Sequence, residues 1–180
     1  MSKFFKKKTK KIENKIVNVL GPMIIQISVL QLKKIMNIWS IVLDDYSQLK
    51  LYVYFNAILI AVFDRLLTRK MDYASRGRVI NIVIDTLEAS FCKQEAYGKT
   101  IEERKLLFNK LFDDMFKELI NCESVMGEGE NVMIVSSQKL FQWYLPNEDL
   151  NDDLFVSTVK EIGNTVVAMI STDSIKKILD

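Results

Sequence analysis

The sequence predicts an all-α fold: a single-domain bundle of five or six helices that follows a basic N-terminal arm. Apolar residues repeat at steps of three and four along most of the 180 residues, the spacing of one helix face. Only 6 glycines and 2 prolines are present, too few for the many tight turns of a β-sandwich. Hydrophobic residues make up 49% of the chain and charged residues 27%, a composition typical of chains that fold around a core.

The predicted organisation is a flexible basic arm over residues 1–15 and one helical domain over residues 16–180. The arm holds seven lysines against Glu13 alone, a net charge of +6, whereas the rest of the chain carries 18 basic and 22 acidic residues, a net charge of −4. The candidate contacts with an anionic surface are Phe4, Phe5, Lys6, Lys7, Lys8, Lys10 and Lys11. Apolar anchors beside lysines suit an anionic membrane surface, and lysine runs also bind nucleic-acid phosphates. A solvated arm that only aids solubility explains the same residues.

Two apolar stretches, Ile16–Leu32 and Leu49–Phe63, are interrupted by polar residues and fall short of the ~20 apolar residues that a membrane span requires. We therefore expect buried helices and no transmembrane span. The lysines followed by an apolar run resemble a secretory signal only poorly, because no alanine precedes Ala57 to form a small-residue cleavage site. The expected location is cytoplasmic, with the membrane periphery as an alternative.

The first helix of the domain is predicted to begin at Gly21-Pro22, because proline suits the first position of a helix. Its expected buried face follows steps of three and four through Ile25, Val29, Leu32, Met36, Trp39 and Leu43, and this face is widened by Ile24, Ile27, Ile35, Ile38 and Val42. The segment Leu49–Leu67 is apolar nearly all round and should be the most buried helix. Asn56 lies on its apolar seam, where a buried amide fixes helix register.

The second half of the chain is divided by clear local signals. Residues 67–78 form a predicted linker with a second basic cluster of Arg69, Lys70, Arg76 and Arg78. A helix over residues 79–91 is expected next, with Ser75 as its cap. The sequence Thr100-Ile-Glu-Glu103 is a capping box that begins another helix. A loop is expected over Asn121–Asn131, an extended piece over Val132–Val135, and a short helix from Ser137 that Pro146 ends. The last helix should bury Phe155, Val159, Ile162, Val166 and Met169.

Several chemistries are excluded by composition. The chain has no histidine, which rules out Ser-His-Asp and Cys-His catalysis and the HExxH zinc site. Cys92 and Cys122 match no metal spacing and read as reduced thiols. We expect no metal, no cofactor and no catalytic residue. The acids within or beside apolar helices are Asp44, Asp45, Asp64, Asp85, Asp113 and Asp114, and the sequence does not bring any two together.

The expected function is a non-enzymatic helical module that binds another protein while its arm rests on an anionic surface. The candidate contacts with a protein partner are Phe141, Trp143 and Tyr144, because these aromatics cannot all face one side of a short helix and Trp and Tyr are favoured at interfaces. Two alternatives stay open. One is a nucleic-acid-associated protein that uses the arm, and the other is a helical enzyme that uses carboxylates.

Overall fold

The computed structural model describes residues 3–68, 70–93, 100–125, 132–148, 152–173 and 175. These residues form six helices and no strand, so the predicted all-α bundle is confirmed. The helices are α1 (Lys3–Trp39), α2 (Asp45–Thr68), α3 (Tyr73–Cys92), α4 (Ile101–Val125), α5 (Val132–Tyr144) and α6 (Asp153–Ile170).

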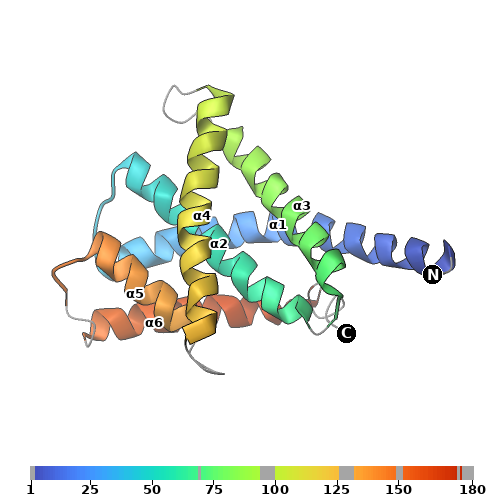
Figure 1. Cartoon of the computed structure of the whole chain (residues 1–180). Helices are drawn as coiled ribbons and strands as arrows, with labels where there is room; N and C mark the ends of the chain where they lie inside the picture. The colour runs from blue at the N-terminus through green and yellow to red at the C-terminus, as the bar shows by residue number, and fades with distance from the viewer. Residues whose placement is uncertain are drawn as a thin grey trace.

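Helix α2 is the centre of the fold. It packs against α1, α3, α4 and α5, and Figure 1 shows α4 crossing in front of it while α1 runs behind. Every residue from Leu51 to Ala61 is buried, which confirms the prediction for this segment. Helix α6 packs mainly against α1 and α5. Helix α6 therefore lies at the edge of the bundle, beside α1 and α5.

The predicted start of the first helix at Gly21-Pro22 is wrong, because α1 runs unbroken from Lys3 to Trp39 with Pro22 inside it. Pro22 and Asn18 are both exposed, so water can satisfy the carbonyl that loses its amide partner to proline. Gly21 is buried, and a Cβ at this position would lie 3.0 Å from Thr86 Cγ2 of α3. Glycine thus allows α1 and α3 to approach closely.

The predicted flexibility of the arm concerns residues 1–15, and it stays a prediction. The side chains of this segment lie outside the described residues except that of Asn14, although the helix assignment itself begins at Lys3. The sequence also predicts that residues 1–12 are mobile, and this too stays a prediction.

The buried face of α1 agrees with the predicted one only in part, since Ile24, Ile35 and Trp39 are buried as expected. Val29 is 39% exposed, and the buried seam consists of Ile16, Leu20, Ile24, Ser28, Gln31, Ile35 and Trp39. Periodicity could not select this face, because apolar residues occur on nearly every side of the helix. Two polar residues are turned inward, where each has a hydrogen-bond partner on another helix. The Ser28 hydroxyl donates to Asn56 Oδ1 of α2 at 2.7 Å, and Gln31 contacts Thr165 of α6.

The junction between α2 and α3 is shorter than the predicted linker, since α3 already begins at Tyr73. Asp72 rather than Ser75 caps α3: its Oδ1 accepts from the Ser75 backbone amide at 3.0 Å. The predicted capping box of α4 is confirmed. The Thr100 amide donates to Glu103 Oε2 at 2.8 Å, and the Glu103 amide donates to Thr100 Oγ1 at 3.2 Å.

Two further predictions in the second half are wrong. Helix α4 continues to Val125, into the predicted loop, of which residues 126–131 lie outside the described part of the chain. Residues 132–135 form the first turn of α5 instead of an extended piece. The β-branched preference is overridden here by burial, because Val135 is 5% exposed. Helix α5 ends at Tyr144, two residues before Pro146, as predicted.

Two described segments, Ile16–Trp39 and Asp45–Thr68, are long and apolar enough to cross a membrane. The second segment is the central helix of the fold, and its most apolar window is 72% buried. The corresponding window of the first segment is 33% buried. Length and composition are met equally by core helices of soluble proteins, so the absence of a membrane span stays a prediction.

Candidate functional site

Helices α1 and α6 lie antiparallel and enclose a groove of about 670 Å³. Their direction follows from three contacts. Lys34 meets Glu161, Gln31 meets Thr165, and Met23 Sδ lies 3.8 Å from Thr172 Oγ1. In these three pairs the residue number falls along α1 as it rises toward the end of α6, so the two helices run in opposite directions. The register of this antiparallel pairing stays nearly constant along the groove. A volume of this size is in the range of small-molecule sites, about 300–1,000 Å³.

The groove is polar at one end and mainly apolar along the rest of its length. Gln31, Lys34 and Thr165 line the polar end. The rest of the lining is Val19, Pro22, Met23, Ile27, Leu30, Ala168 and Met169, with two polar residues, Gln26 and Thr172, among them. Leu30 is 59% exposed, which leaves a large apolar side chain open to solvent at the edge of the groove. Concave sites with a mostly apolar lining and a few convergent polar groups are typical of ligand binding.

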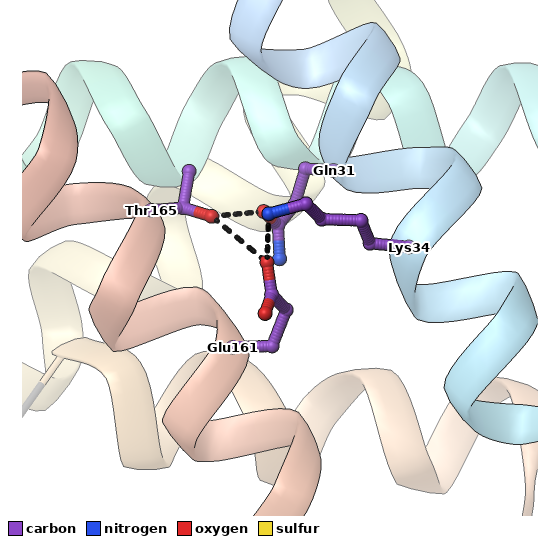
Figure 2. A network of polar contacts seen from close by, with 4 residues as sticks. All are labelled: Gln31, Lys34, Glu161 and Thr165. Carbon is purple, nitrogen blue, oxygen red and sulfur yellow. Dashed lines mark hydrogen bonds and ion pairs between the residues drawn. The ribbon is translucent and has the colours of Figure 1, made fainter.

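Figure 2 shows four side chains that converge at the polar end. Lys34 Nζ lies 2.8 Å from Glu161 Oε1, in an ion pair that joins the two helices. The Thr165 hydroxyl is hydrogen-bonded to Gln31 Oε1 and lies 3.4 Å from Glu161 Oε1. A hydroxyl has a single proton, so Thr165 can donate to only one of these two acceptors at a time.

Gln31 is the most unusual residue of the groove. It is 2% exposed, and its Nε2 has no hydrogen-bond partner among the described residues. Leaving a buried polar group without a partner costs about 1–3 kcal/mol. A group brought by a ligand could remove that cost.

The sequence prediction missed Gln31 and the groove. In the sequence, Gln31 is one of the polar residues that interrupt the apolar stretch Ile16–Leu32. A usable signal lies in the spacing of Ser28 and Gln31, which fall on the same helical seam as Ile24 and Ile35. Two polar residues on an otherwise apolar seam indicate partners on a neighbouring helix.

The three aromatic residues predicted to contact a protein partner lie in different environments. Phe141 is 1% exposed and packs edge-on against Trp39, with ring centroids 5.9 Å apart. Tyr144 is half-buried, and its hydroxyl donates to the Ser47 carbonyl at 3.0 Å. Burial raises the pKa of Tyr144. Trp143 is 36% exposed, and its ring lies 5.4 Å from Lys50 Nζ. A surface formed by this helix would therefore consist of Trp143 and the edge of Tyr144.

The predicted basic residues are only partly described. Lys6, Lys7, Lys8, Lys10 and Lys11 belong to α1 with Phe4 and Phe5, but their side chains lie outside the described residues. In the second cluster, Arg76 Nε lies 3.1 Å from Asp64 Oδ1, and Arg78 donates to Ser75 Oγ at 2.9 Å. Arg69 is not described.

The acids considered for a carboxylate enzyme are spread over several helices. Asp44 accepts from the Ser47 hydroxyl at 2.7 Å, which lowers the pKa of that carboxyl. Asp64 pairs with Arg76, and Asp113 lies 3.9 Å from Lys117 Nζ. No group of three or more potential metal ligands occurs among the described residues. Cys92, half-buried, is a free thiol whose pKa burial raises.

Comparisons with known proteins do not assign a function. The groove and the arm are therefore the two features from which a function can be argued. No family model, no curated protein and no solved structure matches this chain significantly.

Proposed function

We propose that this chain is a non-enzymatic helical interaction module that rests on an anionic membrane surface through its basic arm and presents a binding groove beside it. What supports the proposal is the continuity of α1. One helix, Lys3–Trp39, carries both the lysines of the arm and the α1 wall of the groove. The first part of α1 extends beyond the other helices in Figure 1, so the arm can reach a surface without the bundle in the way.

The charge distribution favours adhesion through the arm alone. Each lysine near an anionic bilayer contributes about 1 kcal/mol, screened over ~8 Å at physiological salt. Seven lysines are enough for reversible adhesion, and Phe4 and Phe5 add apolar insertion. The remainder of the chain has a net charge of −4 and is repelled by the same surface. The opposite charges of the arm and of the rest of the chain hold the bundle away from the membrane.

The test is co-sedimentation with vesicles of phosphatidylserine and phosphatidylcholine. Full-length protein should sediment at low salt, and deletion of residues 1–11 should abolish this. A variant with Lys6, Lys7, Lys8, Lys10 and Lys11 changed to Gln is the matched control for charge. Thermal unfolding of all three should agree, because the buried seam of α1 begins at Ile16 in the described part of the helix. Undiminished sedimentation of the deletion variant would refute the proposal.

The module is also proposed to bind another protein, through Trp143 and Tyr144. The exposed Trp143 ring lies beside Lys50, and tryptophan is enriched in interface hot spots. Partner capture should be compared for wild type, Trp143→Ala and a control, Leu106→Ala, which removes a more exposed apolar residue from α4. Identical partner lists for wild type and Trp143→Ala would count against this surface.

The nucleic-acid alternative is decided with the same variants. Retention of DNA on filters over a salt series measures phosphate binding by the lysines. Retention at low salt together with no vesicle binding would favour the alternative over the membrane surface.

A further inference from the structure

We infer that the groove between α1 and α6 binds a neutral single-chain amphiphile: a molecule with one apolar chain and an uncharged, hydrogen-bonding head such as a glycerol ester. This ligand rests on the proposed function in one respect: the chain is a binding module and not an enzyme. Four properties of the groove support it, and each concerns a different part of the ligand.

The first property is the lengthwise separation of polar and apolar groups. The antiparallel register places Lys34 beside Glu161 and Gln31 beside Thr165 at one end. From Gln31 to Val19 the groove follows α1 for twelve residues, about 18 Å at 1.5 Å per residue. An amphipathic helix repeats its apolar face at every turn and places polar groups along its edges. Polar lining residues are concentrated at one end, as Gln31, Lys34, Asn164 and Thr165, and Gln26 and Thr172 are the polar residues along the rest of the described lining. A molecule with a head and a tail therefore matches the groove better than a helix does.

The second property is the unsatisfied amide of Gln31, which selects the head. Gln31 Oε1 is bonded to Thr165, and Nε2 has no partner among the described residues. Turning the amide by 180° exchanges the two atoms and leaves the oxygen as the atom without a partner. A hydroxyl group can satisfy either orientation, because it donates and accepts.

The third property is the neutrality of the polar end. Lys34 is the cation that lines the groove, and its Nζ lies 2.8 Å from Glu161 Oε1. A charged carboxylate head would lose its hydration and would face Glu161, and no unpaired cation occurs among the described lining residues to replace the lost water. The groove therefore favours an uncharged head over a fatty-acid carboxylate.

The fourth property is an apolar wall that can adapt to a chain. Met23 and Met169 line the groove on opposite helices, and methionine fills irregular gaps through its unbranched, flexible side chain. Leu30, 59% exposed at the edge, would be covered by a ligand. Burial of this apolar surface provides the binding affinity, and the Gln31 amide determines which head group the ligand carries.

The experiment uses the full chain and isothermal titration calorimetry, with 1-monolauroylglycerol and lauric acid as probes with the same chain and different heads. Wild type should bind one monolauroylglycerol, about tenfold more tightly than lauric acid, because only the glycerol ester satisfies the amide without burying a charge. Gln31→Leu should bind monolauroylglycerol more weakly than wild type does, and its preference over lauric acid should shrink without vanishing, because the cost of burying the carboxylate charge remains. The variant removes a buried amide without a full set of partners, and the Thr165 hydroxyl can still donate to Glu161 Oε1, so its stability should be preserved.

Blocking the groove separates this inference from non-specific apolar binding. Ala168 is exposed and lines the groove, so Ala168→Phe should fill it without straining the core and should weaken monolauroylglycerol binding at least tenfold. Ala74→Phe makes the same change at an exposed site on α3 and should bind like wild type. The variant without residues 1–11 should bind the probe normally, which separates the groove from the vesicle test of the arm.

Three results would overturn the inference. One is the absence of monolauroylglycerol binding, and another is equal binding by wild type and Ala168→Phe. The third is binding of a designed amphipathic helical peptide, lost in Ala168→Phe, with no binding of monolauroylglycerol. That result would assign the groove to a protein helix.

Discussion

The Ser28 hydroxyl donates a 2.7 Å hydrogen bond to Asn56 Oδ1, and both residues are fully buried. The bond joins α1 to the central helix α2 inside an otherwise apolar contact. It gives Asn56 a specific partner, as expected for an amide that fixes the register of two helices.

Removing one partner of this bond should destabilise the fold, whereas removing both should not. Asn56→Leu leaves the Ser28 hydroxyl without its acceptor, and Ser28→Ala leaves the Asn56 oxygen without its donor. Each should lower the free energy of unfolding by about 1–3 kcal/mol. The double variant should lie within about 1 kcal/mol of wild type. Urea unfolding measures all four proteins, and single-variant losses that simply add up in the double variant would contradict the proposed coupling.

The bond from Trp39 to Thr158 should be equally sensitive. Trp39 Nε1 donates to Thr158 Oγ1 at 2.9 Å, and both residues are buried between α1 and α6. Thr158→Val keeps the shape of the side chain but removes the acceptor, and it should cost about 1–3 kcal/mol because the indole N–H stays buried. Ser157→Ala on the exposed side of the same helix should change stability by less than ~0.5 kcal/mol. Equal losses in thermal unfolding would refute a specific role for the bond.

Ser40 should be a site of easy stabilisation. It ends α1 in the left-handed region, with φ 52°, and the following Ile41 amide donates to the Met36 carbonyl at 3.3 Å. A residue with a side chain is strained there, whereas glycine is not. Ser40→Gly should raise the free energy of unfolding by about 0.5–1 kcal/mol. Ser40→Ala, which keeps the Cβ, should give no gain, and a gain of the same size in that variant would exclude backbone strain as the cause.

Acid should weaken the starts of α2 and α3. The Asp44 and Asp72 carboxylates accept hydrogen bonds from Ser47 and Ser75, which holds the pKa of each carboxyl below its ordinary value. Because the pKa of each carboxyl is lower in the folded protein than in the unfolded chain, the ionised carboxylates stabilise the fold. This stabilisation is fully present above the unfolded pKa, near 3.9, and is lost as the pH falls through the folded pKa.

The measurement is the melting temperature from roughly pH 6 down to pH 3, which brackets the ordinary aspartate pKa. The double variant Asp44→Asn and Asp72→Asn keeps polar caps that cannot titrate, so its melting temperature should fall less steeply in acid. A wild-type slope in the double variant would assign the acid sensitivity to other groups.

Local signals in the sequence determined much of this fold. The capping box at Thr100 and Glu103, the end of α5 before Pro146 and the burial of Leu49–Leu67 follow from neighbours in the chain and from apolar composition. These features depend on backbone groups and side chains a few residues apart, or on a helix so apolar that any orientation buries it. The sequence therefore predicts them before any tertiary contact is known.

Only the tertiary structure decided which side of α1 is buried, and with it the groove. The apolar repeat favours Val29, yet Ser28 and Gln31 turn inward, because Ser28 donates a hydrogen bond to Asn56 of α2 and Gln31 accepts one from Thr165 of α6. Gln31 and Thr165 are 134 residues apart, so no local pattern connects them. A polar side chain can be buried only where a partner meets it, and that partner is placed by the packing of the whole chain.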